Sequence, residues 1–345
     1  MPPGAHSRRS ESDDTTGTHL VGGPYFDDLS VGTVFDTAPG VTLTEGLSAA
    51  HQAILGDRIR LALDAHLSHK VTGAPTAVAN PGLVCDVAIG QSTLATHHVK
   101  ANLYRGLRFH RFPHLGDTLY TRTEVVGLRE NSGRRGRRPT GLAALRMTTT
   151  DQDGQTVLDF YRCAMLTLSD TPDPARVVHA DDLSSIGPSH TTAWSIPDHW
   201  NLNTYRDRVP GEHFSPSLVG TEFVNGGDVV TSAPELARLT LNIATVHHDE
   251  RVGGSRLVYG GHTIGIALAQ TVRALPNLVT VLGWDSCDHT GPVREGDTLT
   301  STVEVVAADP IGDAWAVQLR SVVHAHGATN ADRPVLDWVF TALMI

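Results

Sequence analysis

The sequence predicts an α+β fold made of two similar units joined in one chain. Segments of the first half recur in the second half in the same order, which indicates an internal duplication. In each half, helix-like stretches precede strand-like segments rich in alternating and β-branched residues. The length of 345 residues allows two domains of ordinary size, and 40% hydrophobic with 19% charged residues is typical of a globular protein.

The duplication is the most specific of these signals. The paired segments are 31–35 with 219–223, 116–126 with 296–306, and 157–159 with 335–337. The second pair opens with Gly-Asp-Thr-Leu and closes with Glu-Val-Val in both copies. Because only two copies occur, the repeat predicts two units that are fused in one chain and related by pseudo-symmetry, like the subunits of a dimer, rather than a solenoid.

Composition divides the chain into four parts. Residues 1–23 are polar and contain no apolar core, so they are predicted to be a disordered tail and not a secretory signal. The two units are expected at 24–168 and 217–345. Between them, residues 169–216 are rich in Pro, Asp, Ser and His, which is typical of a linker over a surface.

The second unit shows the order of elements best. Helices are predicted at 234–244 and 262–275, the latter ended by Pro276 and Asn277, and strands are predicted at 279–284, 298–307, 315–324 and 335–345. A shorter helix is expected at 49–55 in the first unit. One long helix followed by a meander of strands predicts an antiparallel sheet wrapped around that helix.

Charge and cysteine content exclude several classes of protein. The net charge of −10 argues against a nucleic-acid binder, and no apolar run approaches the ~20 residues that cross a bilayer. Cys85, Cys163 and Cys287 lie far apart, so no disulfide framework or cysteine zinc site is expected. The expected location is therefore the reducing cytoplasm. The histidines near 97 and 110 lack a third acidic ligand at a recognised spacing, so no metal is expected.

An ordered set of motifs resembles the MaoC-like hydratases. That family has a Gly-Asp pair, a histidine five residues after the aspartate, a His-Gly pair that opens the central helix, and a Pro-x-x-x-Gly-Asp-Thr-Leu strand entry. The strand entry is matched at 292–299 and, in shortened form, at 113–119. Glu130-Asn-Ser132 and Val258-Tyr-Gly-Gly-His262 look like the tandem members of the mesaconyl-CoA hydratase type. The resemblance covers about 24–345.

The resemblance implies a double hot-dog fold and a cofactor-free hydro-lyase. The implied reaction is reversible hydration or dehydration of a short-chain enoyl- or 3-hydroxyacyl-CoA thioester, such as the branched, dicarboxylic mesaconyl-CoA. Such chemistry needs a group that deprotonates water, a proton for the α-carbon, and a donor to the thioester oxygen. The acyl-CoA thioester is the expected partner, with no nucleic acid and no membrane, and a homodimer is a candidate assembly.

The first unit departs from the family at both catalytic positions. Gly56-Asp57 is present, but Ala62 stands where the family has histidine. Asn80 and Pro81 replace the His-Gly pair, and proline has no N–H to offer to an oxygen. We therefore expect this unit to be scaffold or part of the acyl pocket, with Asp57 either a structural hydrogen-bonding residue or a substrate contact.

The second unit keeps more of the pattern. Asn242 and His247 have the spacing of the family's aspartate and histidine, and Tyr259-Gly260 occupies the His-Gly position. An amide orients water but cannot take its proton, so His247 is predicted as base or acid, with Asp249 or His248 assisting. Gly260 N–H is the predicted oxyanion donor. Alternatively, Asn242 is a helix cap and Gly260 merely permits close packing.

Further residues are expected around the substrate: Tyr259, Gly261, His262, Asp249 and Asp57. Tyr259 is either a packed aromatic or a participant, and His262 either caps the helix or approaches a substrate carboxylate. The candidate basic partners for a second carboxylate of the substrate are Arg105, Arg108, Arg256 and Arg273.

Two other function classes stay open. A thioesterase on the same fold needs a carboxylate near the thioester, which Asp249 or Glu235 could supply. A non-catalytic acyl-thioester binder is compatible with the loss of one site and with an amide at Asn242.

Overall fold

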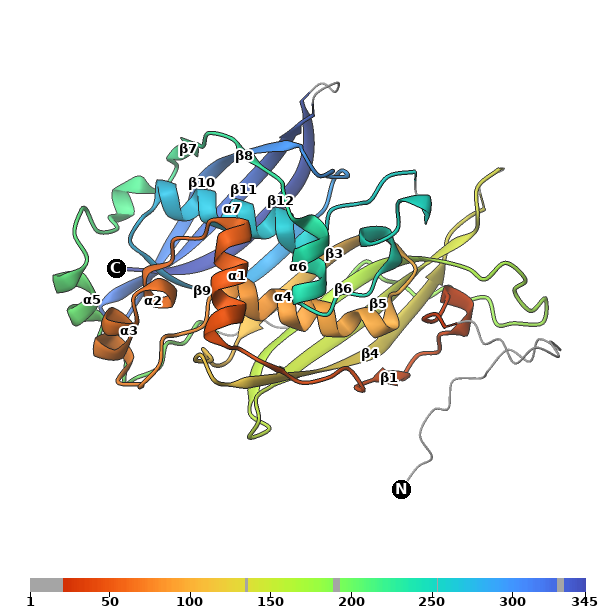
Figure 1. Cartoon of the computed structure of the whole chain (residues 1–345), viewed down its shortest axis with the longest axis horizontal. Coiled ribbons are helices and arrows are strands. Elements are labelled where there is room, and N and C mark those ends of the chain that lie inside the picture. Colours follow the sequence, from red (N-terminus) through yellow and green to blue (C-terminus); the bar gives the residue numbers. More distant parts are fainter. Residues whose placement is uncertain (1–20, 134–135, 189–192, 253, 328–331) are drawn as a thin grey trace.

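The chain forms one large sheet whose two central helices lie over one face (Figure 1). The computed structural model describes residues 21–133, 136–188, 193–252, 254–327 and 332–345. Residues 1–20, nearly all of the tail predicted to be disordered, lie outside the described residues. No helix in the described ranges is both long enough and apolar enough to cross a bilayer.

In the described residues the sheet has twelve strands, and every pair of hydrogen-bonded strands is antiparallel. Its order is β1-β4-β5-β6-β3-β9-β12-β11-β10-β7, while β2 pairs with β4 and β8 with β10. The strands are β1 Val34–Phe35, β2 Val41–Thr42, β3 Val99–Phe109, β4 Thr118–Glu130, β5 Thr140–Thr150, β6 Thr156–Thr167, β7 Glu222–Val224, β8 Asp228–Val229, β9 Leu278–Asp288, β10 Thr298–Ile311, β11 Ala314–His326 and β12 Arg333–Met344.

The two halves of the sheet meet where β3 pairs with β9. This antiparallel ladder runs from Leu103 opposite Asp288 to Arg108 opposite Gly283. Outward from it the order is β3-β6-β5-β4 on one side and β9-β12-β11-β10 on the other. Equivalent strands therefore lie at equivalent distances from the junction, and the internal duplication predicted from the sequence is confirmed as a pseudo-two-fold arrangement.

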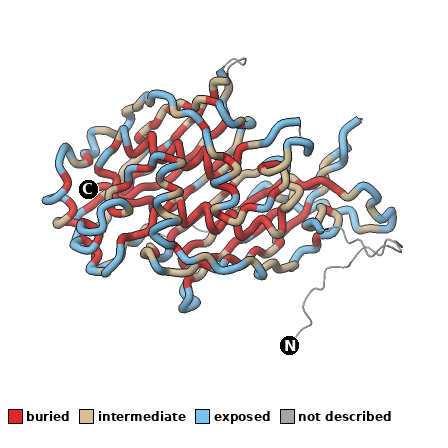
Figure 2. Tube along the Cα trace, in the orientation of Figure 1, coloured by how far each residue is buried: buried red, intermediate tan, exposed pale blue. Residues whose placement is uncertain are grey.

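Two central helices, α4 and α7, lie side by side on one face of the sheet (Figure 1). α4 is apolar except for Asp86 and Gln91 and is buried at every position except Gly82, while α7 is buried from Gly261 to Val272. Figure 2 shows both central helices largely in the colour of buried residues. The helices are α1 Glu45–Leu55, α2 Arg60–Leu63, α3 Ala65–Thr72, α4 Pro81–Gln91, α5 Leu202–Arg208, α6 Ala233–Leu239 and α7 Gly260–Ala274, with 3₁₀ turns at Phe26–Asp28, Ser92–Ala95, Pro216–Leu218, Thr245–His247 and Glu250–Val252.

The repeat extends to individual hydrogen bonds. Gln91 at the end of α4 donates through Nε2 to the carbonyl of Leu119, and Gln270 in α7 donates to the carbonyl of Leu299, each at 2.8–2.9 Å. These carbonyls belong to the leucines of the two Gly-Asp-Thr-Leu segments. The duplicated glutamine therefore joins each central helix to the equivalent strand of its own unit.

One local prediction is wrong, and the segment between the two units contains a helix. The helix predicted at 234–244 ends at Leu239, because the Thr240 hydroxyl bonds to the carbonyl of Leu236 and Leu241 adopts a left-handed backbone with φ of 60°. The segment 169–216, predicted to be a linker over a surface, contains α5. Leu202 and Tyr205 bury α5 against the rest of the fold, and the Tyr205 hydroxyl donates to the carbonyl of Leu278 at 3.3 Å.

Candidate active site

His247 lies at the end of a 3₁₀ turn and is 6% exposed. Its Nδ1 is 2.8 Å from the carbonyl oxygen of Leu257, and because a carbonyl only accepts, Nδ1 carries the proton. The unprotonated nitrogen of the neutral ring is therefore Nε2. Burial lowers the pKa of His247 to about 4, so the ring is neutral at pH 7 and Nε2 can accept a proton.

The imidazole packs against the segment that leads into α7. Tyr259, the residue before the helix, places its ring centroid 5.7 Å from that of His247. The next residue, Gly260, is the first of α7. The first N–H groups of a helix have no partner within the helix, and the helix dipole favours negative charge beside them.

Gly260 lies directly against His289. A Cβ placed on residue 260 would be only 2.7 Å from Nε2 of His289. That nitrogen is buried and has no hydrogen-bond partner among the described residues. Burial, followed by the charge of Arg162, lowers the pKa of His289 to about 4. A neutral imidazole that the sequence did not single out thus lies at the start of α7.

The first unit contributes Asp86 to the same place. A Cβ on Gly261 would lie 1.9 Å from Oδ1 of Asp86, so only glycine lets α7 approach this side chain of α4. The other carboxylate oxygen is 3.1 Å from Nε2 of His51, and both side chains are almost wholly buried. The Tyr259 hydroxyl donates to the backbone carbonyl of Asp86 at 3.1 Å. Tyr259 therefore packs between the two central helices.

Asn242 forms a local turn beside the site. Its Oδ1 accepts a hydrogen bond from the N–H of Ala244 at 3.0 Å, and its backbone carbonyl accepts one from Nε2 of His248 at 2.6 Å. The first contact is an Asx turn, so the side-chain oxygen stabilises the loop that carries His247. The amide nitrogen of Asn242 remains as the group with which this side chain could orient a water.

His262 lies in the first turn of α7 and is fully buried. Neither ring nitrogen has a partner among the described residues, and no side chain caps the N-terminus of α7. The predicted capping role of His262 is therefore wrong. Burial lowers the pKa of this imidazole to about 4, and the neighbouring His51 adds to the effect.

Asp249 is not directed at His247. Its carboxylate pairs with Arg251 at 2.6 Å near the surface, and this hydrogen bonding lowers the pKa of Asp249 to about 2. Glu235, the other carboxylate considered for a thioesterase, pairs with Arg238 at 3.0 Å and is more than half exposed. The two carboxylates that a thioesterase would have used thus form surface ion pairs.

A cleft of about 410 Å³ opens beside Asn242. Its walls come from both units, because the end of α4 faces the loop after α6. The lining residues are Ala38, Pro39, Gly90, Gln91, Thr93, Leu94, Arg238, Leu241, Asn242, Ile243 and His248. The volume is within the range of small-molecule sites, and Asn242, Ile243 and His248, which belong to the loop that carries His247, form part of the lining.

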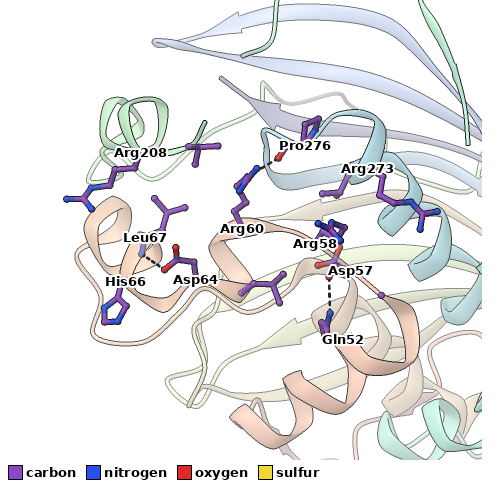
Figure 3. A pocket seen from close by; sticks show the side chains of 14 residues that line it. Gln52, Asp57, Arg58, Arg60, Asp64, His66, Leu67, Arg208, Arg273 and Pro276 are labelled. Atoms are coloured by element: carbon purple, nitrogen blue, oxygen red, sulfur yellow. Dashed lines mark hydrogen bonds between the residues drawn. The ribbon is translucent and has the colours of Figure 1, made fainter. Parts of the chain in front are cut away.

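The equivalent cleft of the first unit is larger, about 1020 Å³ (Figure 3). The loop after α1, with Asp57 and Arg58, faces the end of α7 at Val272 and Arg273. Asp57 accepts hydrogen bonds through Oδ2 from Asn80 and from the N–H of Ile59. This cleft has the greater volume and includes the imidazole of His66, but α4 begins with Pro81 and its next N–H groups, of Gly82 and Leu83, are taken by Oδ1 of Asn80. The chemistry therefore favours the second unit, where the start of α7 has no side-chain cap.

Arg162 on β6 was also missed. It is 1% exposed, donates through Nε to Oδ1 of Asn102 at 2.7 Å and through Nη1 to the hydroxyl of Ser92 at 3.1 Å. Its positive charge helps to lower the pKa of His289, second to burial, and that of His247, where burial and His248 have larger effects. A charged residue within an apolar strand was the signal available in the sequence.

The arginines predicted to meet a substrate carboxylate have partners elsewhere. Arg105 pairs with Asp288 at 2.6 Å, Arg273 pairs bidentately with Asp228, and Arg256 lies 3.7 Å from Glu250. The guanidinium of Arg108 stacks on the ring of Trp194 at 4.6 Å. Within the described parts of the chain, no three His, Cys, Asp or Glu side chains converge as a metal site requires.

Comparisons with known proteins extend over nearly the whole chain. The chain is 28% identical over 333 residues to β-methylmalyl-CoA dehydratase from Chloroflexus aurantiacus, a match that covers 92% of this chain and 91% of that protein. It is 29% identical over 318 residues to mesaconyl-CoA hydratase from Cereibacter sphaeroides, covering 88% and 90%. No family model matches the chain.

Solved structures agree with these relatives. A conserved hypothetical protein from Mycobacterium tuberculosis with a double hot-dog fold is 61% identical, with a TM-score of 0.90 over 94% of this chain and 100% of that one. A MaoC domain dehydratase from Chloroflexus aurantiacus is 27% identical, with a TM-score of 0.77 over 93% and 97%. The predicted double hot-dog fold is confirmed. The chain belongs to the same family of double hot-dog proteins as the Mycobacterium tuberculosis protein, and it is similar over nearly its whole length to a MaoC domain dehydratase.

Proposed function

We propose that the chain is a hydro-lyase that reversibly adds water across the double bond of a short-chain enoyl-CoA thioester. The observation that carries the proposal is the buried His247, whose Nδ1 is held by the Leu257 carbonyl so that Nε2 is free to handle a proton beside the start of α7. The whole-length similarity to a named hydratase and a named dehydratase supports both directions of the reaction.

In the forward direction, Nε2 of His247 accepts a proton from water while the water oxygen bonds to the β-carbon. The electrons of the double bond move toward the thioester, and its oxygen gains negative charge. Gly260 N–H stabilises that charge at the N-terminus of α7. The protonated imidazole then delivers the proton to the α-carbon, and the ring returns to its neutral form.

Asn242 orients the attacking water through its amide nitrogen in this proposal, because its oxygen is engaged with Ala244. His247 is then the only proton-handling member of the pair. Burial keeps its ring neutral in the resting enzyme. Negative charge that develops on the substrate raises the proton affinity of the imidazole during the reaction.

The test is a panel of short enoyl-CoA esters, followed by the loss of the conjugated thioester absorbance. We expect turnover for at least one branched C4–C5 ester, and a kcat lower by about 10² to 10⁴-fold after the substitution His247→Ala. Release of free CoA, followed with a thiol reagent, separates hydration from thioester hydrolysis. Tight binding of CoA esters without any turnover would instead indicate a binding protein and refute the hydro-lyase.

The proposal includes a cytoplasmic location, where the free and buried Cys85, Cys163 and Cys287 stay reduced. It also includes assembly as a homodimer of double hot-dog chains. Light scattering of the purified chain tests the second point, since a homodimer has twice the 36.9 kDa mass of one chain.

A further inference from the structure

We propose that Arg162 recognises a carboxylate at the far end of the acyl group, which makes branched dicarboxylic acyl-CoA thioesters the preferred substrates. The inference deepens the proposed function and rests on it for the position of the reacting carbons. It assigns the basic partner that the sequence alone could not identify.

Arg162 occupies an unusual position for an arginine. It lies in the middle of β6, opposite Tyr104 of β3 and Leu145 of β5, and is 1% exposed. An arginine side chain stays charged in proteins. A buried charge is strongly destabilising unless an opposite charge or several hydrogen bonds compensate it.

The partners of Arg162 do not neutralise this charge. Both hydrogen bonds that the side chain makes go to neutral groups, the amide oxygen of Asn102 and the hydroxyl of Ser92. Among the described residues no carboxylate lies within ion-pair distance of the guanidinium. By contrast, Arg105 on the neighbouring β3 pairs with Asp288. The C-terminus of α4, at Ser92, offers partial negative charge but not a full anion.

The position of Arg162 connects it to the proposed site. Tyr104, directly across the β3–β6 ladder, has its ring centroid 6.0 Å from that of His289, whose Nε2 lies against Gly260. On the other side, Gln91 and Thr93, the neighbours of Ser92, line the cleft beside Asn242. The guanidinium therefore lies between the start of α7 and the inner wall of that cleft.

A ligand that brings its own carboxylate completes this arrangement. An acyl group with a thioester at one end and a carboxylate at the other puts its two polar ends at Gly260 and Arg162. The planar guanidinium suits a carboxylate because it can form two parallel hydrogen bonds. A neutral acyl chain would leave the buried cation without an opposite charge, so the pocket discriminates against it.

A purely structural role is the competing explanation, since Arg162 joins the end of α4 to β3 and β6. The two roles differ in what they affect. A structural arginine changes stability and affects all substrates alike. A specificity arginine changes the ratio between a carboxylated substrate and its neutral counterpart.

The experiment compares two enoyl-CoA esters with the same branched skeleton, one ending in a carboxylate and the other in a methyl group. We expect the unmodified protein to favour the carboxylated ester in kcat/KM. Arg162→Gln should reduce that preference by about a hundredfold. Arg162→Lys should reduce it by about tenfold, because lysine keeps the charge but cannot form two parallel hydrogen bonds to a carboxylate. Arg105→Gln is the matched control on the adjacent strand and should leave the preference unchanged.

Equal effects of Arg162→Gln on both esters would overturn the inference and favour the structural role. If Arg162→Gln does not fold, binding to the unmodified protein decides the question. Calorimetry is then carried out with two saturated CoA esters, methylsuccinyl and 2-methylbutyryl. Tighter binding of the methylsuccinyl ester supports the inference, and equal binding refutes it.

The binding measurement also separates this inference from the reaction. A preference for the carboxylated saturated ester in a protein that hydrates no enoyl thioester refutes the hydro-lyase but leaves the role of Arg162 intact. Turnover of enoyl esters without any preference for the carboxylate supports the hydro-lyase but refutes the role of Arg162.

Discussion

Nδ1 of His247 donates a hydrogen bond of 2.8 Å to the backbone carbonyl of Leu257. This single contact selects the tautomer of the ring and fixes its orientation. It also ties the loop that carries the imidazole to the residues just before α7. The proton-handling nitrogen and the proposed oxyanion donor are therefore held by one short segment of chain.

Removing this imidazole should abolish most of the turnover. We expect His247→Ala to lower kcat by about 10² to 10⁴-fold, the usual contribution of a general acid–base group, with a much smaller change in KM. Steady-state kinetics on an enoyl-CoA ester provide the measurement. His110→Ala is the control, because that ring pairs with Asp159 near the surface and lines neither cleft. A variant with alanine at 247 and an unchanged kcat would falsify the mechanism.

Adding a methyl group at the start of α7 should separate activity from stability. The Cβ of Gly260→Ala would lie 2.7 Å from the ring of His289, a side chain that can shift, so we expect a folded protein with reduced kcat. The Cβ of Gly261→Ala would overlap Oδ1 of Asp86, so we expect a loss of about 1–3 kcal/mol of stability.

Thermal unfolding and kinetics, measured together, test this pair of variants. Gly46→Ala, at an open position in α1, controls for the general effect of alanine in a helix and should leave both readouts near those of the unmodified protein. Normal activity in Gly260→Ala would argue against an oxyanion donor at this position.

Restoring the family's carboxylate should help the reaction. Asn242→Asp keeps an oxygen that accepts from the N–H of Ala244 and adds a second proton acceptor beside His247. We expect kcat to rise several-fold at neutral pH. Asn242→Ala, the matched control, loses the turn and should cost about 1 kcal/mol of stability along with activity. No change in kcat on going from Asn to Asp would show that this side chain serves only the loop.

The buried histidines predict a loss of stability in mild acid. Burial holds the pKa values of His247, His262 and His289 at about 4 in the folded protein, against an ordinary value of about 6.5 in the unfolded chain. Between these values the unfolded chain binds more protons, so the free energy of unfolding falls as pH drops. Each ring contributes up to about 1.4 kcal/mol per pH unit within this window.

Urea unfolding between pH 7 and pH 4 measures this dependence. His262→Leu removes one imidazole that has no partner among the described residues, so this variant should show a shallower slope. It should lose little stability at pH 7, because no hydrogen bond is broken. A slope identical to that of the unmodified protein would contradict the assignment of His262.

The overall fold could be predicted because each repeated element is specified by residues that are close together in the sequence. Gly-Asp-Thr-Leu and the apolar periodicity of residues 262–275 specify elements through near neighbours, and these elements form where expected. The early end of α6 could not be predicted, because the positive φ of Leu241 contradicts the ordinary preference of leucine. The burial of α5 likewise depends on β9, which lies far away in the sequence.

Only the part of the site that belongs to the second unit was predicted from the sequence. His247, Asn242 and Gly260 follow from spacing in the second unit, whereas Asp86 and Arg162 reach the same region from the first. Such residues approach through the packing of α4 on α7 and through the β3–β9 junction. No pattern along the chain shows that a side chain of one unit will face the other.

The ladder between β3 and β9 has a consequence for any attempt to express the halves separately. A fragment ending before residue 217 would expose the edge of β3 at 103–108, and its complement would expose the edge of β9 at 283–288, because these two edges pair with each other among the described residues. Long unpaired edges with apolar neighbours are templates for aggregation. Neither fragment should remain monodisperse alone, whereas co-expressed fragments can shield one another and reconstitute a two-chain enzyme.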